Sequence, residues 1–385
     1  MYVTKIQYEG YRNLKDDYIQ PDKGIHVIYG ENAQGKTNLL EAFWLFTGGH
    51  SFRGTKDGEI PRINPESGKS IDTCKLYLDF YSEGRQQKAK LIIQNGKRSS
   101  VINGVEKKSG TPLVGKVCAV IFSPEHLQLV KSGPAMRRNF IDGAICQIKP
   151  GYAKMLSTYK KIILQRNTLL KEISRNSSLL DTLDIWDMRL AKYGAYVMIQ
   201  RREYINRLSS NVIDIYRGIS RNREEISIGY QPSVSLSFCD ISGSDSKDGS
   251  DVDEAAAEVL VYEALQSSKG VDLRTGHTSA GPHRDDLIIE INSVSARMYA
   301  SQGQQRSAVL AMKLAESQIL QEETGETPLI LLDDVMSELD TGRQDYLLNH
   351  LRDRQVFITC CAPETVRLME QGKRYLVEKG VVCEK

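Results

Sequence analysis

The sequence of 385 residues lacks the features that mark membrane and secreted proteins. No segment approaches the roughly 18 consecutive apolar residues that a membrane-spanning helix requires. The N-terminal stretch MYVTKIQYEGYRNLKDDY contains no apolar core of a signal peptide. We therefore expect a cytoplasmic protein without a membrane partner.

Cysteine and histidine are too few and too scattered to build a metal centre or a disulfide framework. The seven cysteines include no C-x-x-C pair, and the six histidines form no HExxH motif. An odd number of dispersed cysteines is typical of reduced thiols. We interpret these residues as ordinary core and surface positions.

An excess of charge of either sign is also missing from the chain as a whole. Lysine and arginine number 51 against 49 aspartate and glutamate residues, which gives a formal net charge of +2. Nucleic-acid-binding domains usually carry a clear basic excess, so this total does not indicate such a partner. The length exceeds the roughly 250–300 residues at which single cores stop growing, and two domains are expected.

The spacing of apolar residues predicts an α/β protein whose sheet is interrupted by a helical segment. Strands are expected at 1–8, 24–29, 74–81, 88–94, 99–103 and 117–122, with one early helix from 36 to 48. Helical periodicity follows from 152 to 219, with a break at 176–178. The remaining expectations are strands at 227–239, 286–291, 329–332, 356–359 and 375–377, an acidic linker at 240–254, and helices at 255–266 and 304–322.

The helical segment carries the positive charge that the overall total conceals. Residues 149–223 contain 15 lysines and arginines against 6 aspartates and glutamates. The solvated face of a helical bundle explains part of this excess. A surface for an anionic partner is the alternative, and the sequence leaves both interpretations open.

One short segment fits the phosphate-loop pattern G-x-x-x-x-G-K-[ST], between a predicted strand and a predicted helix. Its residues are Gly30, Glu31, Asn32, Ala33, Gln34, Gly35, Lys36 and Thr37. In this pattern the glycines let backbone N–H groups point at phosphates, the lysine supplies positive charge, and the hydroxyl ligates Mg²⁺. We predict that the segment binds a nucleotide, with Lys36 in a catalytic role and Thr37 as a metal ligand.

Two aspartates follow an apolar strand in PLILLDD, at Asp333 and Asp334. A carboxylate at the end of a buried strand beside a phosphate loop organises the metal ion in phosphate-loop enzymes. We predict Asp333 as the metal ligand and Asp334 as the base that orients water. An ordinary acidic turn is the alternative. The distance along the chain from Lys36 to Asp333 requires a large insertion within one ATPase sheet.

Two further strings resemble the signature motif and the D-loop of ATP-binding-cassette ATPases. They are SQGQQR at 301–306 and SELD at 337–340. Ser301 and the backbone N–H of Gly303 begin a predicted helix, where an anion is favoured. The resemblance implies that Ser301, Gly303 and Gln304 cap ATP held by an opposing subunit, and thus an ATP-dependent homodimer.

Over essentially its whole length the chain resembles the RecF family of bacterial recombination mediators, which have SMC-type ATP-binding-cassette heads. The resemblance rests on 10–14, 30–38, 51–53, 122–125, 137–142, 281–286, 301–306 and 331–340. It implies an α/β head with an inserted α-helical domain, and it adds Arg12, Asn13 and Asn38 to the nucleotide site. It also implies ATP and Mg²⁺ as cofactors, double-stranded and gapped DNA as ligand, and RecR and RecO as partners in recombinase loading.

The sequence departs from the cassette pattern at three points. FSPE at 122–125 offers no glutamine for the metal shell, and the nearby Gln128 is not assigned to it. The last core strand is followed by no histidine, which would leave phosphate sensing to Thr359 or to water. Asp334 stands where a glutamate is usual, and its shorter reach suggests slow hydrolysis.

We expect three segments and weigh two other functions. Residues 1–145 and 269–385 are predicted to form the two halves of the head, and 146–268 the inserted helical domain with its linker. The first alternative function is the ATPase subunit of a membrane transporter. The second is an adaptor in which ATP acts only as a switch.

Overall fold

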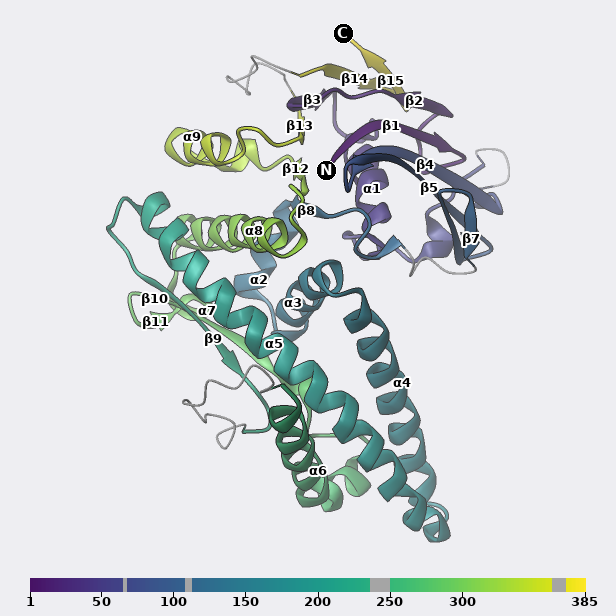
Figure 1. Cartoon of the computed structure of the whole chain (residues 1–385), viewed down its shortest axis with the longest axis vertical. Coiled ribbons are helices and arrows are strands. Elements are labelled where there is room, and N and C mark those ends of the chain that lie inside the picture. Colours follow the sequence, from purple (N-terminus) through teal and green to yellow (C-terminus); the bar gives the residue numbers. More distant parts are fainter. Residues whose placement is uncertain (65–67, 108–112, 236–249, 362–371) are drawn as a thin grey trace. The chain divides into compact units, whose positions relative to one another are not determined.

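The computed structural model describes residues 1–64, 68–107, 113–235, 250–361 and 372–385, without side chains at 250–253 (Figure 1). The chain divides into two compact units. The head unit comprises residues 1–131, 211–226 and 298–385, and the insert unit comprises 132–210 and 227–297. Within the described residues, no helix has an apolar stretch long enough to cross a bilayer.

The head unit contains an antiparallel sheet in the order β2-β1-β4-β5-β6-β7. Its strands are β1 (Tyr2–Glu9), β2 (Asp17–Ile19), β4 (Thr73–Ser82), β5 (Arg85–Gln94), β6 (Lys97–Ile102) and β7 (Val105–Lys107). The Asn-Gly pairs of the sequence predict hairpin turns at Asn95-Gly96 and Asn103-Gly104, and both are confirmed, with positive φ at all four residues. Such turns match the twist of the flanking strands. Alternating burial along β4 and β5 gives the sheet one core face and one outer face.

A second, mixed sheet of the head unit has the order β15-β14-β3-β13-β12-β8. Its strands are β3 (Ile25–Tyr29), β8 (Ala119–Phe122), β12 (Leu329–Asp333), β13 (Val356–Cys360), β14 (Arg374–Glu378) and β15 (Val381–Glu384). Neighbours are parallel except for β14 and β15. Every residue of β8, β12 and β13 is buried, as expected for parallel strands covered on both faces. The predicted mixed α/β class is confirmed.

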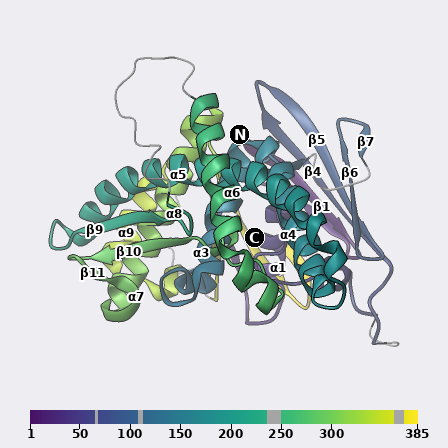
Figure 2. The same cartoon turned by 90° about the horizontal axis from the view of Figure 1, so that it is seen from below.

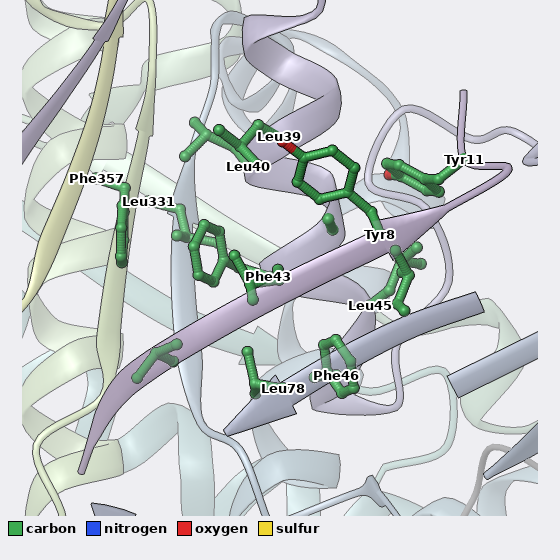
Figure 3. Close-up of a cluster of buried hydrophobic side chains, with 14 of the residues drawn as sticks. Tyr8, Tyr11, Leu39, Leu40, Phe43, Leu45, Phe46, Leu78, Leu331 and Phe357 are labelled. Carbon is green, nitrogen blue, oxygen red and sulfur yellow. The ribbon is translucent and has the colours of Figure 1, made fainter. Parts of the chain in front are cut away.

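Helix α1 (Lys36–Trp44) packs into the apolar core of the head unit (Figure 3). Phe43 stacks on Phe357 of β13 at 4.2 Å between ring centroids, and Tyr8 of β1 belongs to the same cluster. Leu39, Leu40 and Phe43 thus fix the start of α1 by burial, which places the loop before it. The other helices of this unit are α2 (Gln128–Lys131), α8 (Gln302–Thr324) and α9 (Thr341–His350).

The insert unit is mainly helical, as Figure 2 shows. Its elements are α3 (Pro134–Ile148), α4 (Pro150–Ile173), α6 (Ser250–Thr275), β9 (Ile226–Gln231), β10 (Asp286–Ile291) and β11 (Val294–Ser295). Helix α5 (Leu183–Ser220) belongs to this unit as far as residue 210, and α7 (Ala296–Tyr299) leads back to the head unit. The strands form a sheet in the order β11-β10-β9. The predicted break between two long helices is confirmed at 174–182.

Two sequence-based expectations need correction. The acidic linker predicted for 240–254 is wrong at 250–254, which form the first turn of α6, and residues 236–249 lie outside the described chain. Glu254 and the alanines that follow it are good helix formers, so the helix predicted from 255 also includes the preceding residues. The strand expected to resume after Pro232 is not formed in 232–235, since β9 ends at Gln231.

The outer borders of the insert unit lie at 131/132 and 297/298, with 211–226 left to the head unit, whereas the sequence predicts borders at 145/146 and 268/269. Helix α3 and strand β10 therefore lie in one unit, whereas the sequence predicts them in the two head halves. Ion pairs hold them there. The Arg137 Nε atom lies 2.6 Å from an Asp286 oxygen, and the Arg201 Nε atom lies 2.9 Å from an Asp142 oxygen. Sequence spacing alone does not reveal such long-range pairs.

Candidate functional site

The phosphate-loop segment connects β3 to α1, and its shape depends on two glycines. Gly30 has a φ of +145°, and a Cβ atom there would lie 2.3 Å from the Val377 carbonyl oxygen. Gly35 has a φ of +117°, and a Cβ atom there would lie 2.7 Å from Leu14 Cδ2. No other residue type fits such contacts without displacing backbone or core atoms. The glycines predicted from the pattern are therefore required by the fold.

Lys36, the first residue of α1, turns its ammonium group back across the loop. Its Nζ atom donates to the carbonyl oxygens of Gly30, at 2.6 Å, and Glu31, at 2.9 Å. The residue is only 8% exposed. A buried lysine held by carbonyl groups keeps its positive charge fixed at the loop, where it favours an anion.

Thr37 and Asp333 meet at the carboxyl end of the parallel strands. The Thr37 hydroxyl donates to Asp333 Oδ1 at 2.8 Å, and the Thr359 hydroxyl donates to the same oxygen at 2.8 Å. Asp333 pairs with Thr359 in the β12–β13 register, so the sheet itself brings these groups together. Burial raises the pKa of Asp333, and the two hydroxyl groups oppose that shift.

The oxygens of Thr37 and Asp333 suit a hard cation such as Mg²⁺. Within the described residues, no group of three or more histidine, cysteine, aspartate or glutamate side chains is positioned to hold a metal alone. A Mg²⁺ ion here would therefore need phosphate oxygens to complete its ligands, which is the usual arrangement for this ion.

Asp334 lies one residue beyond β12 in a strained backbone conformation. Its φ of +53° is uncommon outside glycine, although aspartate tolerates it better than most residues. The Asp334 N–H donates to the Thr359 hydroxyl at 2.9 Å, and the Ser337 hydroxyl donates to Asp334 Oδ1 at 3.2 Å. The D-loop serine thus orients the exposed carboxylate.

Thr359 does not have the placement that a phosphate sensor needs. The residue is 1% exposed, and its hydroxyl is shared between Asp333 and the Asp334 backbone. Cys361, two positions on, is exposed instead. Its thiol lies 4.0 Å from Lys36 Nζ and donates to Asn32 Oδ1 at 3.4 Å. Sequence reasoning did not select Cys361, although its position just past β13 was a usable signal.

A row of polar side chains supports the loop from the side of β1. Asn13 Nδ2 donates to the Ala33 carbonyl at 3.2 Å, and Asn38 Nδ2 donates to Asn13 Oδ1 at 2.7 Å. Arg53 then donates to Asn38 Oδ1 at 2.9 Å. On the other side of the loop, the Gln34 amide oxygen accepts from the Lys379 N–H at 2.6 Å.

Arg12 is directed away from the loop toward a buried carboxylate. Its Nε and Nη2 atoms each lie 2.8 Å from an oxygen of Glu41, a fully buried residue of α1. Tyr11 donates to the same carboxylate at 2.9 Å, and Ser51 also donates to it. Such a bidentate pair fixes the arginine strongly. Arg12 is therefore close to the site but bound to the helix behind it.

The signature segment begins α8 through a capping box. The Ser301 hydroxyl accepts from the Gln304 N–H at 3.2 Å, and Gln304 Oε1 accepts from the Ser301 N–H at 2.8 Å. Gln304 Nε2 donates to Glu224 Oε1 at 2.9 Å, which connects the signature to residues 211–226 of the head unit. A Cβ atom at Gly303 would lie 3.5 Å from Arg343 Nη2, an ordinary van der Waals distance, so the fold itself does not require glycine at this position.

Two acidic residues escaped prediction from the sequence. Glu224 follows α5 and joins Gln304 to Tyr216, whose hydroxyl donates to it at 2.7 Å. Glu125, in the turn after β8, contributes to the raised pKa of Asp333, after the effect of burial. Glu125 belongs to the FSPE string that offered no glutamine, so a carboxylate occupies that part of the site. A single acidic residue has no pattern around it that would mark it as part of a site.

Comparison with known proteins adds an independent line of evidence. Residues 2–382 match the family described as the RecF/RecN/SMC N terminal domain. A DNA replication and repair protein RecF of Acetivibrio thermocellus is 41% identical over 365 residues, which cover 94% of each chain. The corresponding protein of Bacillus mycoides is 37% identical over 396 residues, covering 100% of this chain and 99% of that protein.

Solved structures agree with these matches. The recombination mediator protein RecF-ATP of the RecFOR pathway superimposes with a TM-score of 0.85 at 34% identity, covering 100% of both chains. An Smc head domain from Pyrococcus furiosus, at 14% identity, covers 100% of this chain and 96% of that domain with a TM-score of 0.54. The latter likeness concerns the fold alone.

Proposed function

The chain belongs to the RecF family, within the wider RecF/RecN/SMC group, and from this premise we propose an ATP-dependent DNA-binding protein of recombinational repair and replication restart. Relatives that it matches over nearly their whole length are named DNA replication and repair proteins. One observation carries the proposal. Lys36 binds back onto the phosphate loop, and its neighbour Thr37 is hydrogen-bonded to Asp333.

ATP is the proposed ligand of this loop. A solved relative is described in its ATP form, which supports the same nucleotide here. Residues 30–38 would bind its phosphates through backbone N–H groups, with Asn13 supporting the loop. Thr37 and Asp333 would hold Mg²⁺, which neutralises phosphate charge. Lys36 and Asp334 are the proposed catalytic residues.

Hydrolysis is proposed to be slow and to time release from DNA. Asp334 is held by Ser337 and by its strained backbone, so its short side chain has little freedom to follow a water molecule. Fast turnover by the protein without DNA would contradict this part of the proposal.

A homodimer is proposed to form when ATP is bound. Ser301, Gly303 and Gln304 lie at the N-terminus of a long helix, where partial positive charge favours a phosphate. ATP held by residues 30–38 of one copy would be capped by this segment of another. The dimer would bind double-stranded and gapped DNA in the cytoplasm, with RecO and RecR as partners in recombinase loading.

Substitution of Lys36 tests the scheme directly. Lys36→Ala should abolish ATP-dependent dimerisation, because the fixed positive charge at the loop is lost. Sedimentation velocity with and without ATP would measure this, and Lys97→Ala, at an exposed position of β6, is the matched control. An unchanged ATP-bound dimer of Lys36→Ala would overturn the proposed ATP site.

One further experiment separates the proposed function from the two alternative functions. A mobility shift with gapped duplex, with and without ATP, should show ATP-stimulated binding if the protein acts on DNA. An adaptor that uses ATP only as a switch would give no shift in either state. A transporter ATPase would behave likewise, and the names of the full-length relatives do not support that function.

A further inference from the structure

The outer face of the antiparallel sheet contains a basic pocket that the ATP site does not use. It has a volume of about 280 Å³, and its lining includes Lys5 of β1, Tyr77 of β4, and Lys88 and Lys90 of β5. Figure 2 shows β1, β4 and β5 side by side in this sheet. All of these residues lie in the head unit, so the geometry of the pocket does not depend on the insert unit.

Strand register explains why the three lysines share a face. Lys5 and Lys88 both pair with Asp79, on opposite sides of β4, and Lys90 pairs with Tyr77. Residues two apart on a strand point the same way, so Lys88 and Lys90 project together about 7 Å apart. The KAKLIIQ pattern of β5 therefore buries Ala89 and Leu91 while it presents both lysines outward.

The positive charge of the pocket is largely uncompensated. Within the described chain, none of Lys5, Lys88 and Lys90 forms an ion pair, and Asp79 is the only carboxylate in the lining. Lysines usually extend into water with free rotation, but two of these are held by aromatic rings. Lys5 Nζ lies 4.4 Å from the centre of the Tyr18 ring, and Lys90 Nζ lies 5.0 Å from that of Tyr77.

The same contacts indicate which part of a nucleic acid would bind. The ammonium groups of Lys5 and Lys90 each cover one face of a tyrosine ring, that of Tyr18 and that of Tyr77, so this face is not open for base stacking. Fixed ammonium groups instead suit phosphate oxygens, which carry no sequence information. A concave wall also strengthens the attraction of a charged group for its ligand.

We propose that Lys5, Lys88 and Lys90 form a binding site for the phosphate backbone of DNA. The inference rests on the DNA-binding function proposed above and adds the location of the contacts. It places the DNA contacts outside the basic segment 149–223, for which an anionic partner was one of two interpretations of the sequence. Two of the arginines in that segment, Arg166 and Arg201, are buried in ion pairs and unavailable to a ligand.

A triple substitution tests the site. Lys5→Gln, Lys88→Gln and Lys90→Gln together should weaken binding of a fluorescent 30-base-pair duplex about 10- to 100-fold in the presence of ATP. The slope of log affinity against log salt should become shallower by about 2.7, because three phosphate contacts are lost. Fluorescence anisotropy over a salt series measures both quantities.

Two control variants separate a local site from general electrostatics. Lys56→Gln, Lys97→Gln and Lys107→Gln together remove the same charge from the head unit outside the pocket, and should retain wild-type affinity within about threefold. Replacing the three pocket lysines with arginine should restore most of the binding, since the charge returns. ATP-dependent dimerisation should be unchanged in every variant.

The outcomes distinguish the inference from the function on which it rests. Wild-type protein that binds no DNA with or without ATP would overturn both. If the triple variant binds DNA as tightly as the wild type does, the proposed pocket site alone would be overturned. The pocket is likewise overturned if the control triple loses as much affinity as the pocket triple, or if the loss is accompanied by a failure to dimerise with ATP.

Discussion

The two units of the molecule use charged sequence motifs in opposite ways. In the head unit, motif residues lie at loop ends and keep groups available at the surface, as Ser301 and Asp334 do. In the insert unit, the motif residues are buried and paired with one another. Arg137 of RRNFID binds Asp286 of GPHRDD through two contacts of 2.6 and 2.8 Å.

A second network of the insert unit has the same character. Arg201 forms a bidentate pair with Asp142, 2.9 Å at each oxygen, and Tyr152 donates to that carboxylate at 2.6 Å. Arg166, Asp187 and Asp272 are all 0% exposed. Such networks leave no group free to contact a ligand. A charged motif shared with a family therefore indicates fold in one unit and chemistry in the other.

Breaking the buried network should have the largest effect on stability. Arg166→Met leaves Asp187 and Asp272 buried without their cation, and should lower the free energy of unfolding by about 3–5 kcal/mol. Urea denaturation followed by circular dichroism would measure it. Arg175→Met, at an exposed position after α4, should change stability by less than about 0.5 kcal/mol. A loss below about 1 kcal/mol for Arg166→Met would remove the contrast between the units.

Removing the buried carboxylate of Asp333, in the head unit, should instead raise stability. Burial raises the pKa of Asp333, so its ionisation opposes folding, and stability falls as pH rises from about 4 through the raised pKa. Asp333→Asn keeps an oxygen for the Thr37 and Thr359 hydroxyls. The variant should be up to about 1 kcal/mol more stable at pH 7, with the gain vanishing below about pH 4.

ATP hydrolysis by the same variant should fall by at least about 100-fold, since the proposed metal ligand is lost. Phosphate release would measure the hydrolysis rate, and thermal unfolding at several pH values would measure the change in stability. Glu378→Gln, at the exposed end of β14, serves as the control. A destabilised Asp333→Asn would show that this carboxylate, too, supports the fold.

A smaller effect is expected where residues 211–226 contact the signature segment. Glu224→Gln replaces a charged acceptor of Gln304 and Tyr216 with an amide, and should weaken ATP-dependent dimerisation about 3- to 10-fold. Sedimentation equilibrium with ATP would report the dimer constant. Asp214→Asn, whose side chain is 81% exposed, should leave it unchanged. Equal effects of the two substitutions would mean that Glu224 does not position the signature.

The smallest effect concerns Cys361. Its thiol is exposed beside Lys36, so alkylation by iodoacetamide should be slowed by bound ATP, whereas alkylation of the exposed Cys383 should not. Mass spectrometry of labelled peptides compares the two sites within one sample. Cys361→Ser should change ATP affinity by less than about twofold, because serine keeps a donor for Asn32. Equal protection of both thiols would contradict this placement.

The sequence allowed prediction of elements whose signal is local. Apolar runs indicated β8, β12 and β13, glycine dipeptides indicated the hairpins, and the phosphate-loop pattern placed Lys36 and Thr37 beside Asp333. Each depends on backbone conformation or on burial of a few adjacent residues. The resemblance to a family then added Asn13 and Asn38, which lie beside the loop.

Long-range polar pairing could not be predicted in this way. The Glu224–Gln304 bond and the Arg137–Asp286 pair join residues far apart in the chain, and either partner alone looks like ordinary surface charge. The net charge of +2 likewise gives no sign of the local positive charge of the pocket. Lys5 and Lys88 become neighbours of one pocket only through the register of β1, β4 and β5.

The neighbours of β3 have a consequence for synthesis of the protein. In its sheet β3 pairs only with β13 and β14 among the described strands, and β13 begins at Val356. At about 5–20 residues per second, a ribosome needs about 15–65 s to travel from one to the other. Throughout that interval the phosphate loop has no neighbouring strand to fix its start. We therefore expect the nascent chain to bind no nucleotide before the signature segment has been translated.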